Sequence, residues 1–592
     1  MRRAFVVLLC LVSFCAFGAS KETLNIPKDK IGSHVLFGSR IVHINRAHGK
    51  VFAEGQRNHH PVLMEICNHG DSVIVLRPLR YVNQQGMRMV HHGKPINGAV
   101  LPIVAQDDST FTVDISGYFS TYPEIISAIP PKMLKGRASK HKIVSVKYFD
   151  TYLQVTGNYS YESGWVVTAN CYILFLKDTP MDFRIVDPAK AGYNFVEYKD
   201  TLGNLRKLSH RWDISQGQPI VFYVDRRFPP EWFPYIKEGI EDWNKTFEAI
   251  GLHDVIEVRP EPKDGSFDRF SPLVNMVRFI NVDEYNAQGD VLVDPRSGEI
   301  LHGDILWWKK VLDLMCDWRY VQTGASDPAA RAKEYPIEML GPMIRHSMCH
   351  EMGHVLGLSH NMGASWSYPS DSLRSVTFTR EFGTAASVMD YARYNHLATA
   401  SDVAAGVNLM PPRPGPYDYY AIALGYAPEG SAVPGKYCYY APFISAAISP
   451  DPSSQGETLG NDLLRSSAAG LDNCCRLLEL DGLDEARTKV LRKQYYKYVS
   501  LALSNIGGTV AGKPVGRRLR NKTLKFVYES LARVPELLRN PREEQKIIEE
   551  LTGNFLPKRV EENCGKWALR QYNSKLRRLG KKYPELHNTN NQ

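Results

Sequence analysis

A short run of residues near the middle of the chain has the types and the spacing that bind a catalytic metal. His350 and His354 are four positions apart, and Glu351 directly follows the first histidine. On an α-helix, side chains four positions apart lie on the same face, so both histidines can direct a ring nitrogen at one ion. A carboxylate beside such an ion can accept the proton of an attacking water. Glu351 is therefore the candidate general base of a metal-assisted hydrolysis.

A third ligand has to come from outside this helix. If the helix continued, His360 would stand about 9 Å further along the axis than His354, too far for a shared ion. Gly357 lies between them and can adopt the positive φ that ends a helix. We therefore predict that the chain turns at Gly357 and that His350, His354 and His360 hold one catalytic Zn²⁺.

Two neighbours of the predicted ligands could compete for a role. His346 lies one turn before His350 on the same face, and we expect it to support the site or contact substrate rather than replace His360. Cys349 is next to a ligand in sequence, but its side chain points about 100° round the helix from it. We interpret Cys349 as a packing residue.

The sequence resembles the metzincin clan of zinc endopeptidases. The clan pattern H-E-x-x-H-x-x-G-x-x-H is matched from His350 to His360, and a methionine-containing turn follows as Ser387-Val388-Met389-Asp390-Tyr391. The stretch from about Pro219 to Tyr426 looks more closely like the catalytic domain of exported bacterial Met-zincin metalloproteases. Further short motifs fit that resemblance: Arg296 to Leu301, His360-Asn361, Tyr417 to Ile422 and, beyond the stretch, Ile506-Gly507-Gly508.

This resemblance implies zinc, peptide-bond hydrolysis and export. It also implies that Met389 lies beneath the three histidines as a hydrophobic base for the site. Tyr391 matches a tyrosine that some metzincin families use near zinc, where a phenol can stabilise the oxyanion of a tetrahedral intermediate. The resemblance does not identify a substrate.

The elements around these motifs predict an α+β protein in three parts after its leader. Short β-rich runs separated by Gly, Asn and Asp predict a β-rich domain over residues 20–208. Residues 209–430 resemble the metzincin catalytic domain, a twisted mixed sheet with helices. Residues 431–592 contain charged helical patterns separated by proline and glycine, which predict a helical C-terminal region.

Two segments of the middle part have clear secondary-structure patterns. One apolar helix stripe is formed by Ile236, Ile240, Trp243 and Phe247. The segment from Gly298 to Trp308 is typical of a strand, and the resemblance places it as the upper edge strand of the cleft, where an extended peptide could pair with it. An ordinary edge strand packed by Ile305 and Trp307 is the alternative.

The N-terminal segment predicts export. Arg2 and Arg3 precede a mostly apolar stretch from Ala4 to Phe17, which ends at the small residues Gly18-Ala19-Ser20. A stretch of about 14 residues is short for a bilayer span, and this order is typical of a cleaved signal peptide, here residues 1–19. We expect a secreted, periplasmic or cell-surface protein, with an uncleaved anchor as the alternative. No later apolar run is long enough to predict a membrane span.

The charge of the chain points only weakly to a polyanionic partner. The formal net charge is +9 over 592 residues. Basic residues gather in a late run that includes Arg517, Arg518, Arg520, Lys522 and Lys525, and in a tail from Arg577 to Lys582. We interpret them as a solvated helix face, with binding to nucleic acid or another acidic surface as the alternative. The partner that we expect is a protein or peptide substrate, and no nucleic acid.

These observations predict an exported zinc-dependent endopeptidase. The expected mechanism is metal-assisted hydrolysis. Glu351 deprotonates the water and later protonates the leaving amine, while Tyr391 stabilises the oxyanion. Two alternatives are a surface binding or adhesion module on a metalloprotease scaffold, and a zinc hydrolase of a non-peptide amide. An intact Glu351 argues against the first, because a scaffold has no need of a general base. The metal motif alone does not exclude the second.

Overall fold

The computed structural model describes residues 22–45, 52–58, 61–91, 97–265, 267–435, 440–442, 448–480 and 482–587. The predicted signal peptide, residues 1–19, lies outside them. The chain divides into two units. The first comprises Met1–Tyr81 and His91–Pro180, and the second comprises Val82–Val90 and Met181–Gln592.

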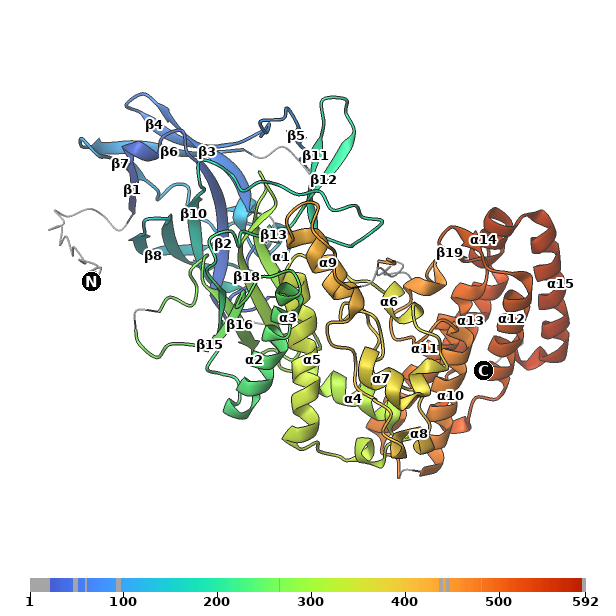
Figure 1. The fold of residues 1–592 in the computed structure, drawn as a ribbon. Helices are drawn as coiled ribbons and strands as arrows, with labels where there is room; N and C mark the ends of the chain where they lie inside the picture. The colour runs from blue at the N-terminus through green and yellow to red at the C-terminus, as the bar shows by residue number, and fades with distance from the viewer. Residues whose placement is uncertain are drawn as a thin grey trace. The chain divides into compact units, whose positions relative to one another are not determined.

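The first unit is built on one nine-stranded antiparallel sheet with the order β1-β7-β6-β4-β3-β2-β10-β9-β8 (Figure 1). Its elements are β1 (Thr23–Pro27), β2 (His34–Ile44), β3 (Val62–His69), β4 (Val73–Pro78), β6 (Ala99–Gln106), β7 (Thr110–Asp114), α1 (Pro131–Leu134), β8 (Lys140–Tyr148), β9 (Tyr152–Ser160) and β10 (Val166–Phe175). Alternate side chains of a strand face opposite sides of a sheet, and in β7 Phe111 and Val113 are the buried ones. The β-rich N-terminal region predicted from the sequence is confirmed.

The second unit contains a mixed sheet. Its strands are β13 (Arg211–Trp212), β14 (Ile220–Val224), β15 (Ile256–Pro260), β16 (Asn275–Ile280), β17 (Ala287–Asp294) and β18 (Glu299–Trp308). The order is β13-β18-β16-β14-β15 with parallel pairs, and β17 pairs antiparallel with β18. A small sheet of β12 (Leu205–Ser209), β11 (Phe195–Lys199) and β5 (Arg88–Met89) belongs to the same unit.

The prediction that Gly298 to Trp308 forms the edge strand is wrong. This segment is β18, which pairs with β16 on one side and β17 on the other. A tight turn that includes Gly298 at φ +81° folds residues 287–294 back along it, so β17 takes the edge instead. The sequence gives little sign of β17, because its first half, Ala287 to Asp290, is polar or small and only partly buried.

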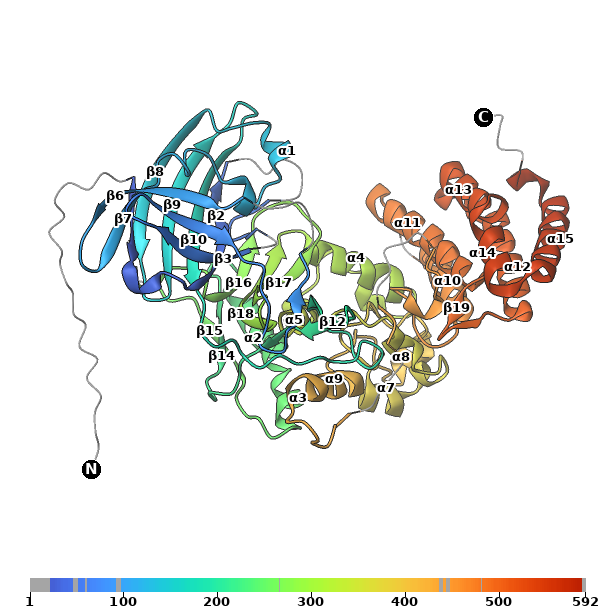
Figure 2. The same cartoon turned by 90° about the horizontal axis from the view of Figure 1, so that it is seen from above.

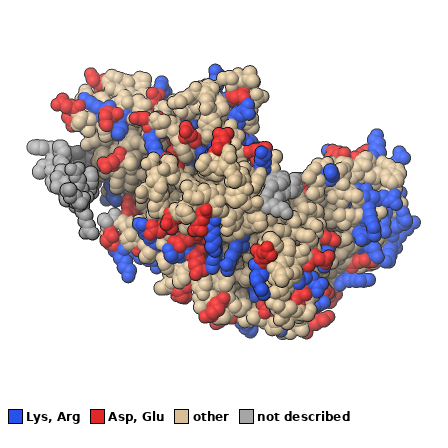
Figure 3. All heavy atoms as spheres, in the orientation of Figure 1, with Lys and Arg blue, Asp and Glu red and all other residues tan. Residues whose placement is uncertain are grey.

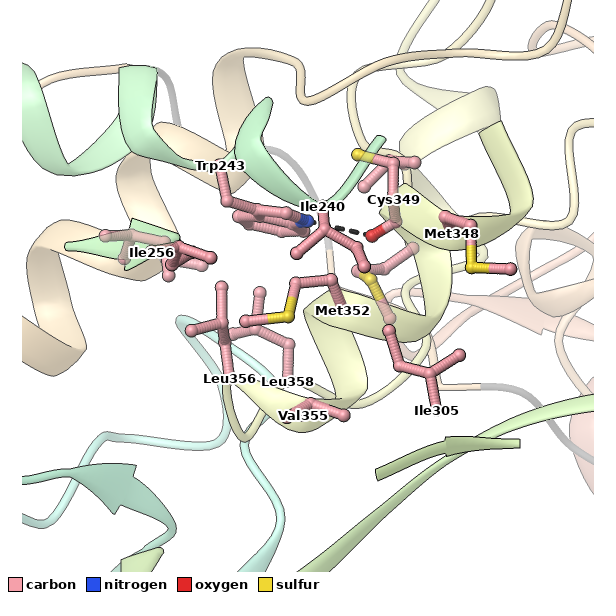
Figure 4. Packing of buried hydrophobic residues seen from close by; sticks show 14 of the residues in the cluster. Ile240, Trp243, Ile256, Ile305, Met348, Cys349, Met352, Val355, Leu356 and Leu358 are labelled. Carbon is pink, nitrogen blue, oxygen red and sulfur yellow. Dashed lines mark hydrogen bonds between the residues drawn. The ribbon is translucent and has the colours of Figure 1, made fainter. Parts of the chain in front are cut away.

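Helices cover this sheet around one long central helix, α5 (Ile337–Val355). The others are α2 (Phe233–Glu241), α3 (Asn244–Glu248), α4 (Val311–Thr323), α6 (Gly363–Trp366), α7 (Val376–Phe382), α8 (Ala400–Ala404) and α9 (Pro416–Tyr426). The predicted apolar stripe is fully buried, although it spans α2 and α3 rather than one helix. Figure 4 shows Ile240 and Trp243 packed against Met348 and Met352 of α5, with the Trp243 indole donating to the Cys349 carbonyl at 2.8 Å.

The last part of the second unit is helical, as predicted (Figure 2). Its helices are α10 (Leu463–Leu480), α11 (Glu485–Ala502), α12 (Arg517–Ala532), α13 (Pro541–Thr552), α14 (Phe555–Cys564) and α15 (Lys566–Lys582), with a short hairpin of β19 (Thr509–Val510) and β20 (Lys513–Pro514). Buried apolar residues such as Leu477, Tyr498, Leu524 and Leu551 join these helices in one core. The predicted α+β fold class is thus confirmed.

The late basic run mostly faces solvent. Lys and Arg side chains gather over the region of α12 and α15 (Figure 3), where Arg517, Lys522 and Arg577 are exposed. Arg520 differs, because it is 3% exposed and its guanidinium lies 3.1 Å from the Cys564 sulfur. Among the described residues, no helix combines the length and the apolar character needed to cross a bilayer.

Candidate active site

Three imidazoles converge at the end of α5. His350 and His354 lie one turn apart on this helix, and His360 follows its end. The Nε2 atom of His360 is 3.2 Å from Nε2 of His350 and 3.1 Å from Nε2 of His354. In the part of the chain that the structure describes, these residues form the one cluster of potential metal ligands, with ligand atoms within 4.8 Å of one another. The structure thus brings together the three histidines that the spacing singled out.

The second ring nitrogen of each helical histidine is held by a backbone carbonyl. Nδ1 of His350 lies 2.7 Å from the oxygen of Val388, and Nδ1 of His354 lies 2.9 Å from the oxygen of Leu358. A carbonyl oxygen only accepts, so both Nδ1 atoms carry the proton and both Nε2 atoms present a lone pair. Lone pairs about 3 Å apart repel unless a cation lies among them, and this spacing suits tetrahedral zinc with Zn–N bonds of about 2.0–2.1 Å. The residues fit one catalytic zinc ion.

Burial keeps these three rings neutral, which is the form that binds metal. Desolvation lowers the pKa of His350 well below its ordinary value, and the neighbouring His354 and His360 lower it further. Burial also lowers the pKa of His354. For His360, burial together with the nearby His354 and Arg393 lowers the pKa to about 2. Zinc therefore does not compete with protons for these nitrogens near neutral pH.

The turn that carries His360 back to the centre is a glycine-terminated helix end. Gly357 has a φ of +97°, and its amide donates to the His354 carbonyl at 3.0 Å. The Leu358 amide donates to the Gly353 carbonyl at 3.0 Å, which completes a Schellman motif. A Cβ at Gly357 would lie 2.2 Å from the carbonyl oxygen of His210, so a side chain is excluded there. The turn predicted at Gly357 is confirmed.

Glu351 lies beside the histidines and is held by the edge strand β17. Its Oε2 atom accepts a hydrogen bond from the Gly289 amide at 2.8 Å. A Cβ at Gly289 would lie 2.6 Å from the Glu351 carbonyl oxygen, so only glycine lets β17 approach α5 this closely. Burial raises the pKa of the Glu351 carboxyl to about 7, although the Gly289 amide and Arg393 act to lower it. A carboxyl that titrates near neutral pH is suited to accept and return a proton.

The methionine turn lies against the metal-binding helix and is fixed by α9. Met389 is fully buried, and its sulfur would lie 2.2 Å from a Cβ at Gly353, between the two helical histidines. The Asp418 carboxylate, near the start of α9, accepts the Val388 amide at 2.9 Å. Since the Val388 carbonyl accepts from His350, the α9 carboxylate positions a metal ligand through one residue of the turn.

Tyr391 stands beside the cluster of imidazoles. Its ring centroid is 4.5 Å from that of His360 and 5.6 Å from that of His350. Burial raises the pKa of the Tyr391 phenol, so the hydroxyl keeps its proton near neutral pH and can donate a hydrogen bond. The catalytic roles assigned to Glu351 and Tyr391 stay predictions. Both side chains line the cavity at the three histidines.

The two competing neighbours have the positions expected of them. His346 lies outside the cluster: its Nδ1 atom is 2.8 Å from the Pro412 oxygen, and its ring centroid is 6.4 Å from that of His350. It lines the cavity beside the metal ligands, where it can contact a substrate. Cys349 is 1% exposed and packs in the core shown in Figure 4.

Sequence reasoning missed the contribution of Gly289 and the roles of two further residues, Asp418 and Arg393. Gly289 lies 62 positions before Glu351, and Asp418 lies 30 positions after Val388, so neither contact has a local pattern. Arg393, which lines the same cavity, lies two residues beyond the recognised turn. A charged residue so close to Tyr391 was the one signal that could have been noticed.

Comparison with known proteins agrees with the motifs. A family model described as Met-zincin matches residues 332–530, a range that contains the three histidines, Glu351 and the methionine turn. The recognised resemblance is confirmed over these residues. A search of curated proteins and a search of solved structures each found no match. The family and the histidine cluster together indicate a zinc metallopeptidase-like hydrolase.

Proposed function

From that family match, we propose that the chain is an exported zinc endopeptidase. The observation that carries the proposal is the convergence of three neutral imidazoles beside a buried carboxylate, Glu351, at the edge of a sheet. His350, His354 and His360 would hold the ion. When bound, zinc polarises the scissile carbonyl and makes a water more acidic.

The remaining chemistry belongs to two side chains. Glu351, oriented by the Gly289 amide, accepts the proton of the attacking water and passes it to the leaving amine. The Tyr391 hydroxyl donates a hydrogen bond to the oxygen on which negative charge develops. His350 and His354 are kept in one tautomer by the carbonyls of Val388 and Leu358, so the ligand nitrogens need no rearrangement before the reaction.

The edge strand supports a peptide as the substrate. Among the described strands, β17 pairs with β18 alone, and the Gly289 amide points to Glu351 rather than across to β18. Alternate residues of an antiparallel strand direct their backbone groups to the same side, so Ala287 also faces outward. Ala287 lines the cavity at the histidines. An extended peptide that pairs with this edge would bring its scissile carbonyl to the ligands.

Glu351→Gln tests the proposed mechanism. We expect this variant to keep stoichiometric zinc, because Glu351 is not a ligand, and to lose several orders of magnitude in kcat, because an amide cannot accept the proton. Elemental analysis and cleavage of a quenched peptide measure the two quantities. Near-wild-type activity would remove Glu351 from the mechanism.

The two alternative functions are separated by substrate. Purified protein is incubated with casein and with a peptide library, each with and without a chelator. Chelator-sensitive cleavage within peptides supports an endopeptidase. Intact peptides would favour either a non-peptide amide or a binding module that uses the metal site only as scaffold.

Export is the second part of the proposal, and it rests on residues 1–19. N-terminal sequencing of the mature protein, expressed with its own leader, tests it. A new N-terminus near Ser20 outside the cytoplasm is the expected result, and a full-length protein retained in the cytoplasm would contradict export.

A further inference from the structure

A cavity of about 270 Å³ extends from the histidine cluster between α4 and α5. Val311, Leu314 and Met315 of α4 give it an apolar wall. Among the described residues that line it, Arg393 is the one side chain with a fixed positive charge and Glu351 is the one carboxylate. The cavity therefore combines an apolar wall on α4 with polar side chains and a single fixed positive charge near the histidine cluster.

The Arg393 guanidinium lies over two aromatic rings. Its Cζ atom lies 3.8 Å from the Trp318 ring centroid and 4.3 Å from the Tyr391 ring centroid. Such rings attract a guanidinium through its charge but do not occupy its N–H donors, which lie at its edge. Tyr391 in turn contacts His360, so one ring separates the guanidinium from a metal ligand.

The donors of Arg393 have no partner among the described residues. It forms no hydrogen bond or ion pair with them, and its Nε atom is buried. The nearby Glu457 carboxylate is already paired with Lys497 at 2.6 Å, and Glu351 accepts from Gly289. Leaving a buried charged donor unsatisfied is costly, so a ligand that supplies acceptors is favoured at this point.

We propose that Arg393 binds a carboxylate of the peptide substrate, next to the scissile bond. This inference rests on the proposed peptidase function and names the substrate class. A planar guanidinium with several N–H donors matches two carboxylate oxygens better than it matches one neutral carbonyl. The apolar wall on α4 fits the methylene groups of a glutamate side chain, and the same guanidinium would also accept the C-terminal carboxylate of a short peptide.

Three peptide hydroxamates, compared as two pairs that share one compound, test this, because a hydroxamate binds the zinc and places the adjoining residue in the cavity. One pair carries Glu or Gln at that residue, with the C-terminus amidated. The second pair carries Gln there, with the C-terminus as free acid or amide. The dissociation constants are measured on zinc-loaded wild-type protein and on Arg393→Gln, Arg393→Lys and Arg380→Gln, the last being an exposed arginine on α7 as matched control.

We expect wild type to bind one acidic probe about tenfold or more tightly than its neutral twin, as for a hydrogen-bonded charge pair. Arg393→Gln should bind the two twins equally, Arg393→Lys should keep part of the preference, and Arg380→Gln should match wild type. A preference in the first pair identifies an acidic side chain, and a preference in the second pair identifies a C-terminal carboxylate.

Equal binding of both twins in wild type would overturn the proposal. So would a preference that survives in Arg393→Gln, or a loss in that variant that is the same for acidic and neutral probes. Zinc content and thermal unfolding of each variant show that the site is intact. Probe binding requires no turnover, so a failure of peptide hydrolysis, seen with casein, is distinguishable from a failure of carboxylate recognition.

Discussion

The side chains of this centre are each fixed by a partner outside the metal cluster. A carbonyl orients His350, another orients His354, and a strand amide orients Glu351. Such partners set the tautomer and the direction of a ligand before the metal arrives. Individual substitutions should therefore separate metal binding from proton transfer and from charge stabilisation.

Tyr391→Phe tests charge stabilisation at the level of one hydroxyl. We expect kcat to fall about 10²-fold with little change in KM, since a donor that acts mainly on the developing oxyanion contributes little to substrate binding. Zinc content should be unchanged. Tyr419→Phe, on α9, is the control. A rise in KM with kcat unchanged would assign Tyr391 to substrate binding instead.

Asp390 should make stability depend on pH. Burial raises the pKa of this carboxyl to about 8, even though its Oδ2 atom accepts the Ser365 amide at 2.6 Å. The folded protein then holds a proton that the unfolded chain releases near pH 4, so the free energy of unfolding falls as pH rises from about 4 to 8. In Asp390→Asn, an isosteric neutral side chain, this part of the decline should disappear. Denaturant titrations of the metal-free protein at pH 5 and pH 8 measure it, and an unchanged decline would contradict the assignment.

At the residue scale, the contacts between residues close together in the sequence could be predicted. His350, Glu351, His354 and His360 lie within one helix and one turn, so helical geometry and one glycine were enough to bring them together. The partners of those residues could not be predicted, because each comes from another element. The same holds for Arg393, because Trp318, the ring under its guanidinium, lies on α4.

At the scale of elements, the site is made by two close approaches that tolerate no side chain. One is the turn at Gly357 against the carbonyl of His210, and the other is β17 against α5 at Gly289. The second approach could not be predicted. The polar start of β17 has the sequence of a loop, so of the two only β18 was recognised as a strand. With β17 unrecognised, β18 was assigned to the edge that β17 in fact occupies.

Gly289→Ala should separate β17 from α5. The added methyl meets the Glu351 carbonyl and the His354 Cβ at under 3 Å, so the strand has to shift and the bond to the Glu351 carboxylate weakens. We expect kcat/KM to fall about 10-fold or more, while zinc remains bound. Gly117→Ala, where a Cβ meets nothing within 4 Å, is the matched control. Peptide cleavage at wild-type rates would show that the approach is not needed.

At the scale of the whole molecule, composition and pattern predicted the succession of a β-rich region, a mixed region and a helical region. Each region has its own local periodicity, which is why the succession could be recognised. The inclusion of β5 with β11 and β12 in one small sheet of the second unit could not be recognised, because β5 lies far earlier in the sequence than the strand with which it pairs. The domain boundaries drawn from the sequence stay predictions.

Zinc should stabilise the unit that contains α5. An ion that binds only the folded state adds about 4 kcal/mol when its free concentration is a thousand times its dissociation constant, which is a shift of a few degrees for a unit of this size. We expect a chelator to lower the melting temperature and added zinc to restore it. Differential scanning calorimetry measures the shift, with His360→Ala as the control that should no longer respond. A wild-type melting temperature that does not change when chelator is added would contradict a structural contribution of the metal.

The carboxylate of Asp418 ties the first turn of α9 to the ring of His350 through Val388. Thermodynamic reciprocity then applies: whatever free energy the docked helix contributes to ion affinity, the ion returns to the docking of the helix. Fraying of α9 and release of the ion are therefore thermodynamically coupled. Hydrogen exchange of the α9 amides should accordingly slow when zinc is added, at positions that never touch it.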